Sequence, residues 1–321
     1  MKVTTSWKAT TPSFPRRWES SGLDRRALLK AGLCGLAGLA APLVRAQSKL
    51  PTQALNGKVT LITGAPGNLV ALNASDGIVL VDSGSADLAA AVKATLDGAS
   101  VKTLFNTHYH LDQTGGNALF GAEGAAIHAH KITQQWLSAD YYIPAEDRWV
   151  PALPAAARPT ETFRLKGEMT AGDESIEYGY LLEAHTRGDA YVYFRDSNVL
   201  VAGDVASPER DPVHDWFAGG WLGGRVDAMD DLLELANDAT QIVPAYGPVM
   251  TKAQLQAERD MMNHLYDRTT LLTTQGNSAR DMLEAGVLDE VERKFQDPYK
   301  FLYDIAKSHW AHYTNFGGNI V

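Results

Sequence analysis

The chain has 321 residues, of which 45% are hydrophobic and 21% are charged, and its formal net charge is −9. This composition allows a sizeable core in one large or two small domains, and it excludes an intrinsically disordered chain. An acidic protein is a poor candidate for binding nucleic acid, whose phosphates require a basic face, so no nucleic-acid partner is expected.

The first 46 residues have the features of an export signal. Residues 24–30 read DRRALLK, an apolar stretch follows over residues 31–44, and Val44-Arg45-Ala46 offers a small-x-small cleavage site. This order is typical of twin-arginine signals; the alternative is an arginine pair before a buried helix. The apolar stretch is shorter than the ~20 residues of a transmembrane helix. The sequence therefore predicts a bacterial protein that the twin-arginine machinery exports to the periplasm or the medium. No stable membrane insertion is expected after cleavage near Ala46.

Cleavage at this site would change both the charge and the set of metal ligands. Residues 1–46 carry eight Lys or Arg and two Asp or Glu, so the net charge would change from −9 to about −15. The only cysteine, Cys34, would be removed. The mature protein would then have no disulfide, and nitrogen and oxygen ligands would have to hold any metal ion.

The residues after the signal alternate between strand and helix patterns. Short apolar runs separated by turns predict three strands within residues 57–82, and apolar residues at helical spacing predict a helix over 86–96. The elements predicted next are strands at 101–105 and 125–128, a helix at 130–138, strands at 162–165, 175–182, 190–194 and 199–202, a helix at 225–237, a strand at 241–244, and helices from 252 onward. Residues 139–160 and 205–224 are predicted as long irregular loops. This order predicts an α/β fold with two packed sheets and helices outside.

Several polar side chains directly follow predicted strands, where loops commonly carry binding sites. The stretch FNTHYHLDQTGGN, residues 105–117, places His108 and His110 on one side of an extended segment. His185 in EAHTRGD and Asp204 in VLVAGDV follow later strands. Three imidazoles suffice for a zinc site with an open position, to which Asp204 could add a carboxylate. Asp112 is the candidate base, because it could take a proton from the water that a bound ion acidifies.

The remaining histidines are expected to be packed or solvated. They are His128, His130, His214, His264, His309 and His312.

The four motifs together resemble the metallo-β-lactamase superfamily. They are GIVLVDSGS, THYHLDQTGGN, HTRGD and GDV, and their order within residues 57–250 follows that of the family. The resemblance implies a four-layer αββα sandwich with a metal site at the rim of its two sheets. We place the metallo-β-lactamase-like domain at residues 47–250. The helices predicted from 252 onward lie beyond most of the resemblance, and we expect them to form a helical C-terminal extension, residues 251–321, packed on this domain.

The resemblance implies that a first metal site is intact. In the family pattern, His108, His110 and His185 would hold this metal and Asp204 would bridge to a second one. Asp82 would support the histidine loop by hydrogen bonds, without a part in the chemistry.

The second metal site implied by the family departs from the pattern. Asp112 matches it, but Gln113 and Tyr246 stand where two histidines are expected. A glutamine carbonyl binds more weakly than imidazole, and a tyrosine binds well only as phenolate, whose ordinary pKa is ~10. His309 and His312, one turn apart on a predicted helix, could supply a missing ligand. Three states stay open: one zinc with Asp112 as base, two metals with Gln113 and Tyr246 as unusual ligands, or no functional metal.

Two long loops supply candidate substrate contacts. Trp216 and Trp221 would suit an apolar or cyclic substrate above the metal, or would pack the loops against the sandwich. Arg187 would meet a substrate carboxylate, or would pair with Asp189 or Asp204.

The resemblance and the ligands together predict an exported metal-dependent hydrolase. A metal-bound hydroxide would attack a carbonyl of a small-molecule ester, lactone or amide, β-lactams included. Zinc, one or two ions per chain, is the expected cofactor, and iron is possible. The alternatives are a mononuclear iron oxygenase of the persulfide dioxygenase type and a non-catalytic periplasmic binding protein on the same fold.

Overall fold

The computed structural model describes residues 48–55, 58–143 and 147–314. The predicted export signal, residues 1–46, lies outside the described residues, so the signal stays a prediction. Among the described residues, none of the helices has the length and apolar character needed to cross a membrane.

The first sheet has seven strands, which lie side by side in the order β1-β2-β3-β4-β5-β6-β9. They are β1 (Thr52–Ala54), β2 (Val59–Ile62), β3 (Leu69–Ala74), β4 (Gly77–Val81), β5 (Val101–Asn106), β6 (Ala126–His130) and β9 (Glu161–Phe163). The pairs from β1 to β4 are antiparallel, whereas β4 to β9 pair in parallel. Parallel neighbours need a crossover, which α1 (Ala89–Thr95) and α3 (Asn117–Ala122) provide.

The second sheet has five strands in sequence order. They are β10 (Lys166–Ala171), β11 (Glu174–Leu181), β12 (Asp189–Phe194), β13 (Val199–Gly203) and β14 (Gln241–Pro244). All pairs are antiparallel except β13 with β14, which α5 (Leu222–Leu235) connects.

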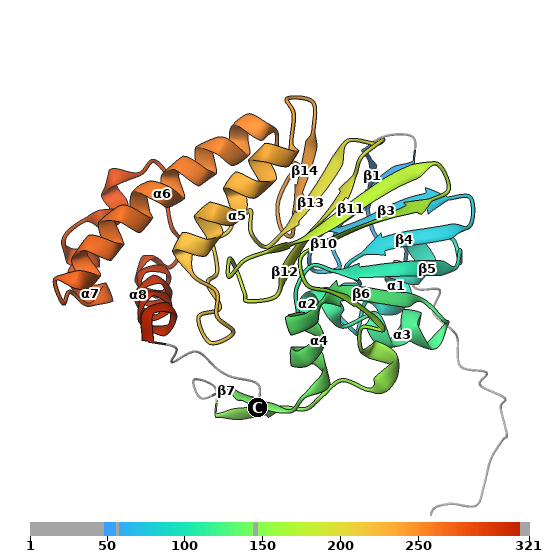
Figure 1. Cartoon of the computed structure of the whole chain (residues 1–321), viewed down its shortest axis with the longest axis horizontal. Coiled ribbons are helices and arrows are strands. Elements are labelled where there is room, and N and C mark those ends of the chain that lie inside the picture. Colours follow the sequence, from blue (N-terminus) through green and yellow to red (C-terminus); the bar gives the residue numbers. More distant parts are fainter. Residues whose placement is uncertain (1–47, 56–57, 144–146, 315–321) are drawn as a thin grey trace, which may run out of the picture. The chain divides into compact units, whose positions relative to one another are not determined.

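Along the central strands, successive apolar side chains alternate between the two faces of each sheet. In β4, Val79 and Val81 pack into the cluster between the two sheets, whereas Ile78 and Leu80 pack on the outer face with α1 and α3. The second sheet repeats this pattern. In β12, Val192 and Phe194 point inward, and Tyr191 and Tyr193 point outward toward α5. Because successive strand residues face opposite sides, each sheet has two apolar faces. The predicted αββα sandwich is confirmed (Figure 1).

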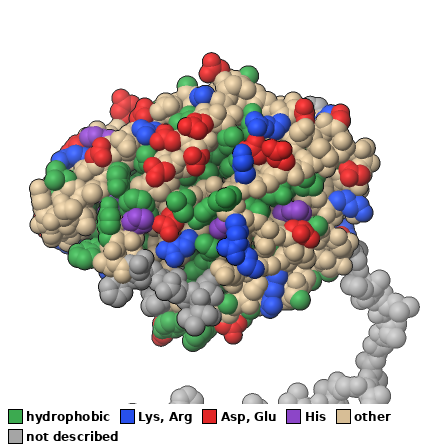
Figure 2. All heavy atoms as spheres, in the orientation of Figure 1, with side chains coloured by type: hydrophobic (Ala, Val, Ile, Leu, Met, Phe, Trp, Pro, Cys, Tyr) green, Lys and Arg blue, Asp and Glu red, His purple; other side chains and the backbone are tan. Residues whose placement is uncertain are grey.

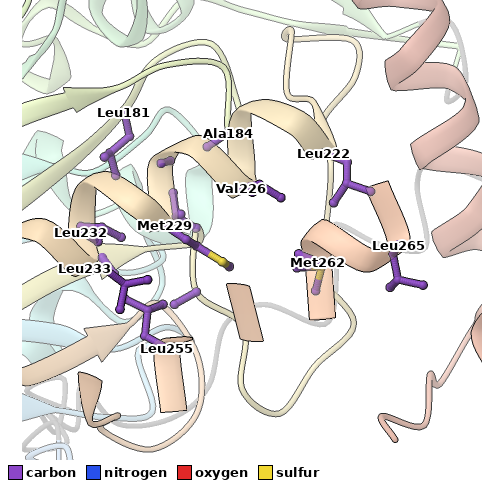
Figure 3. Close-up of a cluster of buried hydrophobic side chains, with 14 of the residues drawn as sticks. Leu181, Ala184, Leu222, Val226, Met229, Leu232, Leu233, Leu255, Met262 and Leu265 are labelled. Atoms are coloured by element: carbon purple, nitrogen blue, oxygen red, sulfur yellow. The ribbon is translucent and has the colours of Figure 1, made fainter. Parts of the chain in front are cut away.

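The largest cluster of buried apolar side chains lies outside the second sheet. Met229 and Leu232 of α5 pack there with Leu255 and Met262 of α6, as Figure 3 shows. The chain continues through α6 (Lys252–Thr274), α7 (Ala279–Glu284), the 3-10 helix η3 (Val287–Glu290) and α8 (Pro298–Thr314). These helices form the outer layer on that side (Figure 1).

Some local expectations were incomplete. The strand predicted at 162–165 is confirmed as β9, and it pairs with β6 of the first sheet. Strand β10 was missed because its exposed positions are polar or charged, as is usual for an edge strand. The loop predicted at 139–160 contains a hairpin, β7 (Tyr141–Ile143) with β8 (Arg148–Val150), and the 3-10 helix η2 (Ala155–Ala157). Two helices, α2 (Leu111–Thr114) and α4 (Lys131–Ser138), complete the described elements.

The surface shown in Figure 2 has mixed charge. Acidic and basic side chains are interspersed over this face, with hydrophobic side chains visible between them.

Candidate metal centre

The candidate ligands lie at the carboxyl ends of three strands. His108 and His110 follow β5, His185 follows β11, and Asp204 follows β13. The three histidines form one group whose ligand atoms all lie within 4.8 Å of one another. Their ring centroids are 4.7 to 4.8 Å apart and their planes are nearly perpendicular. This is the geometry of three side chains that face one point.

The hydrogen bonds of His108 leave one ring nitrogen for a ligand. The hydroxyl of Thr107 donates to Asp82 at 2.7 Å, so its oxygen is left to accept from Nδ1 of His108 at 3.1 Å. The other nitrogen, Nε2, is buried and has no hydrogen-bond partner among the described residues. A buried polar atom without a partner is costly, so this position fits a group that accepts the lone pair.

The other two histidines are oriented in the same way. Nδ1 of His185 donates to the carbonyl of Val213 at 2.8 Å, and Nε2 of His110 lies 2.9 Å from Oδ2 of Asp215. The remaining nitrogens, Nε2 of His185 and Nδ1 of His110, are 3.1 Å apart. Each outward nitrogen thus fixes the ring, as bonds to metal-binding histidines usually do. The three inward nitrogens fit a divalent ion of the zinc type.

The pKa values of the histidines bear on metal binding. Burial and the neighbouring histidines lower the pKa of His108 to about 4 and hold that of His185 well below its ordinary value. Burial also acts to lower the pKa of His110, but the hydrogen bond and charge of Asp215 raise it overall. A metal ion and a proton would therefore compete for His110.

Asp204 lies next to the three histidines. Its Oδ2 is 3.5 Å from Nε2 of His185 and accepts a hydrogen bond from Arg210. Its Oδ1 is buried, and no described residue donates to it. The preceding residue, Gly203, has a φ of 57°, and an added Cβ would meet Thr107 at 3.0 Å. Glycine therefore allows Asp204 and the histidine loop to approach each other.

Of the residues expected at a second metal site, Asp112 and Tyr246 bind each other, whereas Gln113 is buried nearby. The phenol of Tyr246 donates to Oδ2 of Asp112, and burial together with Asp112 raises the pKa of Tyr246, so it stays a neutral donor. Gln113 is fully buried against Gly67, where an added Cβ would lie 2.4 Å from the Gln113 Nε2 atom. Its amide has no hydrogen-bond partner within the described residues.

Asp82 holds the histidine loop in place. Its carboxylate accepts from the backbone N–H and the hydroxyl of Thr107, at 2.8 and 2.7 Å. Burial raises the pKa of Asp82 to about 7, although the two bonds from Thr107 oppose this. The backbone of Asp82 has a φ of 59°, an uncommon conformation for a residue other than glycine.

A pocket of about 670 Å³ opens beside the centre. His110 and Asp112 lie in its lining, and so does the predicted substrate residue Trp216. The buried His214 also lines it, and within the part of the chain that the structure describes neither ring nitrogen of His214 has a hydrogen-bond partner. The lining also includes Tyr141, Arg148, Phe217, Lys300 and Tyr303.

The structure places other candidates elsewhere. Arg187 pairs with Glu183 at 3.1 Å and is not in the pocket lining. The ring of Trp221 stacks on His312 at 3.7 Å between centroids, and its N–H donates to His309. Trp221 therefore packs α8 against the start of α5, and neither histidine supplies a ligand to the centre.

The sequence interpretation missed three residues of the site. Asp215 orients His110, Arg210 pairs with Asp204, and the fully buried Arg225 donates to the carbonyls of Val205 and Val213. Two of them lie in the loop before α5, where no periodic pattern predicts contacts. The glycine-rich start of α5 likewise gave no signal for Arg225.

The fold and the centre define a class of protein. The family model described as the metallo-beta-lactamase superfamily matches residues 62–245, which is more than half of the chain. The chain belongs to this superfamily.

The chain is also similar to individual proteins of known name. The chain is 26% identical over 268 residues to 2,4-dinitroanisole O-demethylase subunit alpha from Nocardioides sp., covering 80% of this chain and 72% of that protein. It is structurally similar to the stereoselective inverting sec-alkylsulfatase Pisa1 from Pseudomonas sp., with 15% identity, a TM-score of 0.60 and 83% of this chain covered. The match spans only 50% of the alkylsulfatase chain. The metallo-beta-lactamase from Pontibacter korlensis matches with 20% identity and a TM-score of 0.54, over 67% of this chain and 99% of that chain. At these identities the solved structures show the shared fold.

Proposed function

We propose that this protein is a metal-dependent hydrolase with one divalent ion per chain. Water would attack the carbonyl of an aromatic ester, lactone or amide, and the C–O or C–N bond would break to release an acid and an alcohol or amine. The observation that carries the proposal is the convergence of three imidazole nitrogens beside an aromatic pocket. His108, His110 and His185 would hold the ion. When bound, such an ion supplies a Lewis acid and lowers the pKa of its water to about 7.

Asp112 is the residue to which we assign proton transfer. It lines the pocket together with His110, and its Oδ2 accepts a hydrogen bond from Tyr246. This bond fixes the carboxylate and leaves its other oxygen to take a proton from water. A positioned base of this kind contributes ~10²–10⁴-fold to the rate.

The pocket walls favour a substrate with an aromatic ring. Tyr141, Trp216, Phe217 and Tyr303 are among its lining side chains, and ring stacking prefers such surroundings. The O-demethylase to which the chain is similar is named for an aromatic methyl ether. Aryl methyl ethers with electron-withdrawing groups are therefore the second substrate class to test.

The decisive experiment measures hydrolysis by the full chain after metal removal and after zinc is restored. The substrates are 4-nitrophenyl esters, aromatic lactones, a chromogenic β-lactam, 2,4-dinitroanisole and a sec-alkyl sulfate. We expect ester or lactone hydrolysis that disappears with chelator and returns with zinc, and none in His185→Ala. If the zinc-loaded protein opened none of these substrates, the hydrolase proposal would be abandoned.

The metal that copurifies with the protein separates this proposal from its rivals. Zinc supports the hydrolase. Iron, together with oxygen consumption on thiol substrates, would favour the oxygenase alternative. Tight ligand binding that chelator leaves unchanged would favour a binding protein.

We also propose export through the twin-arginine pathway, on the order of motifs in residues 24–46. Replacing Arg25 and Arg26 by lysine should leave the protein in the cytoplasm of its bacterial host. Periplasmic accumulation of that variant would contradict the proposal.

A further inference from the structure

Arg210 has an unusual place beside the candidate centre. Its guanidinium donates to Oδ2 of Asp204, and it lies 3.4 Å above the ring centroid of Tyr246. An arginine is charged at every physiological pH, and its flat group stacks on aromatic faces. A permanent positive charge thus lies between the carboxylate that borders the three histidines and a ring that itself binds Asp112.

The environment of Asp204 requires a counter-charge at this point. The side chain is almost completely buried, and a buried carboxylate without a cation or donors is strongly unfavourable. Arg210 is the one Lys or Arg that forms an ion pair with Asp204 among the described residues.

The loop that carries Arg210 is fixed along its length. At its two ends, the carbonyls of Val205 and Val213 accept from the buried Arg225, at 2.8 and 2.6 Å. In its middle, the carbonyl of Arg210 accepts from Arg293. Such a loop holds the guanidinium in one position without help from a metal.

The C-terminal segment adds a second attachment to the loop. Asp211 accepts from the backbone N–H groups of Gln296 and Asp297, at 2.9 and 2.8 Å. These residues follow the part of the chain that the family model matches. The helical extension therefore takes part in placing Arg210.

The neighbouring oxygens are also engaged by donors. Oδ2 of Asp204 accepts from Arg210, and Oδ2 of Asp112 accepts from the phenol of Tyr246. Each carboxylate could therefore offer a second metal ion only its other oxygen, Oδ1, and that ion would meet the guanidinium charge of Arg210. Because of this charge, the residues present do not fit a second ion.

We propose that Arg210 is a positioning residue that replaces a second metal cation, so that this chain holds one ion. This proposal rests on the proposed function, in which three histidines hold one metal ion. It explains why the centre would hold one ion and not two. Arg210 neutralises Asp204, and Tyr246 holds Asp112 beside it.

The test compares binding of a second ion in matched variants of the full chain. Tyr246→His supplies an imidazole, and Arg210→Ala is then added to it. In this background, loss of Arg210 should tighten binding of the second ion by about 10-fold to 100-fold, as metal sites respond to such neighbours. The readouts are elemental mass spectrometry for ions per chain and cobalt(II) absorption titrations for affinity.

Two further variants control the comparison. Arg195→Ala removes an arginine that pairs with Glu177 outside the centre, and it should leave second-ion affinity unchanged. Arg210→Lys keeps the charge and should keep the chain at one ion.

Wild-type protein supplies a measurement that depends on no variant. One ion per chain in excess zinc supports the proposal. Two tightly bound ions with intact hydrolysis would overturn this inference alone, whereas no bound ion would overturn the proposed function as well. An unchanged second-ion affinity after Arg210→Ala would also overturn the inference.

Discussion

The Nε2 atom of His110 lies 2.9 Å from Oδ2 of Asp215, and the same carboxylate accepts the phenol hydrogen of Tyr109. Burial acts to raise the pKa of Asp215, but the hydrogen bonds from His110 and Tyr109 lower it to about 2. Asp215 is therefore ionised at neutral pH, and it turns Nδ1 of His110 toward the other two histidines.

The first prediction follows from this contact. Asp215→Asn should weaken metal binding by about 10-fold to 100-fold, because the neutral amide holds the His110 ring less firmly. Competition with a chromogenic chelator measures the affinity. Asp227→Asn, a change at an exposed position on α5, is the control and should retain wild-type affinity. Equal affinities for both variants would show that Asp215 does not orient the ligand.

The second prediction concerns Asp112. Asp112→Asn should lower kcat by about 10²–10⁴-fold with little change in KM, because the amide cannot accept the proton. Metal content should stay at the wild-type value, which separates a loss of proton transfer from a loss of the ion. A variant that loses its metal instead would make Asp112 a ligand.

The comparison of sequence with structure shows which features depend on local pattern. The alternation Ile78-Val79-Leu80-Val81 predicts β4 because each residue type matches the face it must occupy. His108 and His110 are equally local, since two residues on one extended segment share a side. These parts of the fold and the centre follow from the sequence alone.

The parts that the sequence does not predict depend on the path of one loop. Trp216 and Trp221 are five residues apart in it, yet Trp216 lines the pocket and Trp221 stacks on His312. Asp215 and Arg210 reach their partners through the same path. No periodicity specifies that path, because buried contacts from α5 and the C-terminal segment fix it.

The third prediction concerns acid stability. His130 is buried and stacks on Tyr180 with 3.9 Å between ring centroids. Burial lowers the pKa of His130 from 6.5 to about 4. The unfolded chain therefore binds this proton at a higher pH than the folded chain. The stabilisation of the folded state by uncharged His130 is therefore complete above pH 6.5. It is lost as the pH falls toward 4, and this loss of folding free energy is about 3 kcal/mol in total.

His130→Phe should remove this dependence and keep the stack. Urea unfolding between about pH 7 and pH 5 should show a smaller loss of stability in the variant than in wild type. Tyr180→Phe alters the same stack without removing the imidazole. The stability that this variant loses over the same pH range should therefore match the loss in wild type. The assignment fails if His130→Phe loses as much stability as wild type.

The last prediction concerns the pocket. Trp216→Ala should raise KM for an aromatic ester by about 10-fold or more and change kcat less, because a buried aromatic contact contributes about 1.5–3 kcal/mol to binding. Trp149→Ala is the matched control. Trp149 lies on the β7–β8 hairpin, is 66% exposed and contacts Tyr142 with a tilted ring, outside the pocket lining. An aliphatic ester of similar reactivity should respond less to Trp216→Ala than the aromatic one. If both esters lost affinity equally, Trp216 would shape the loop and not recognise the ring.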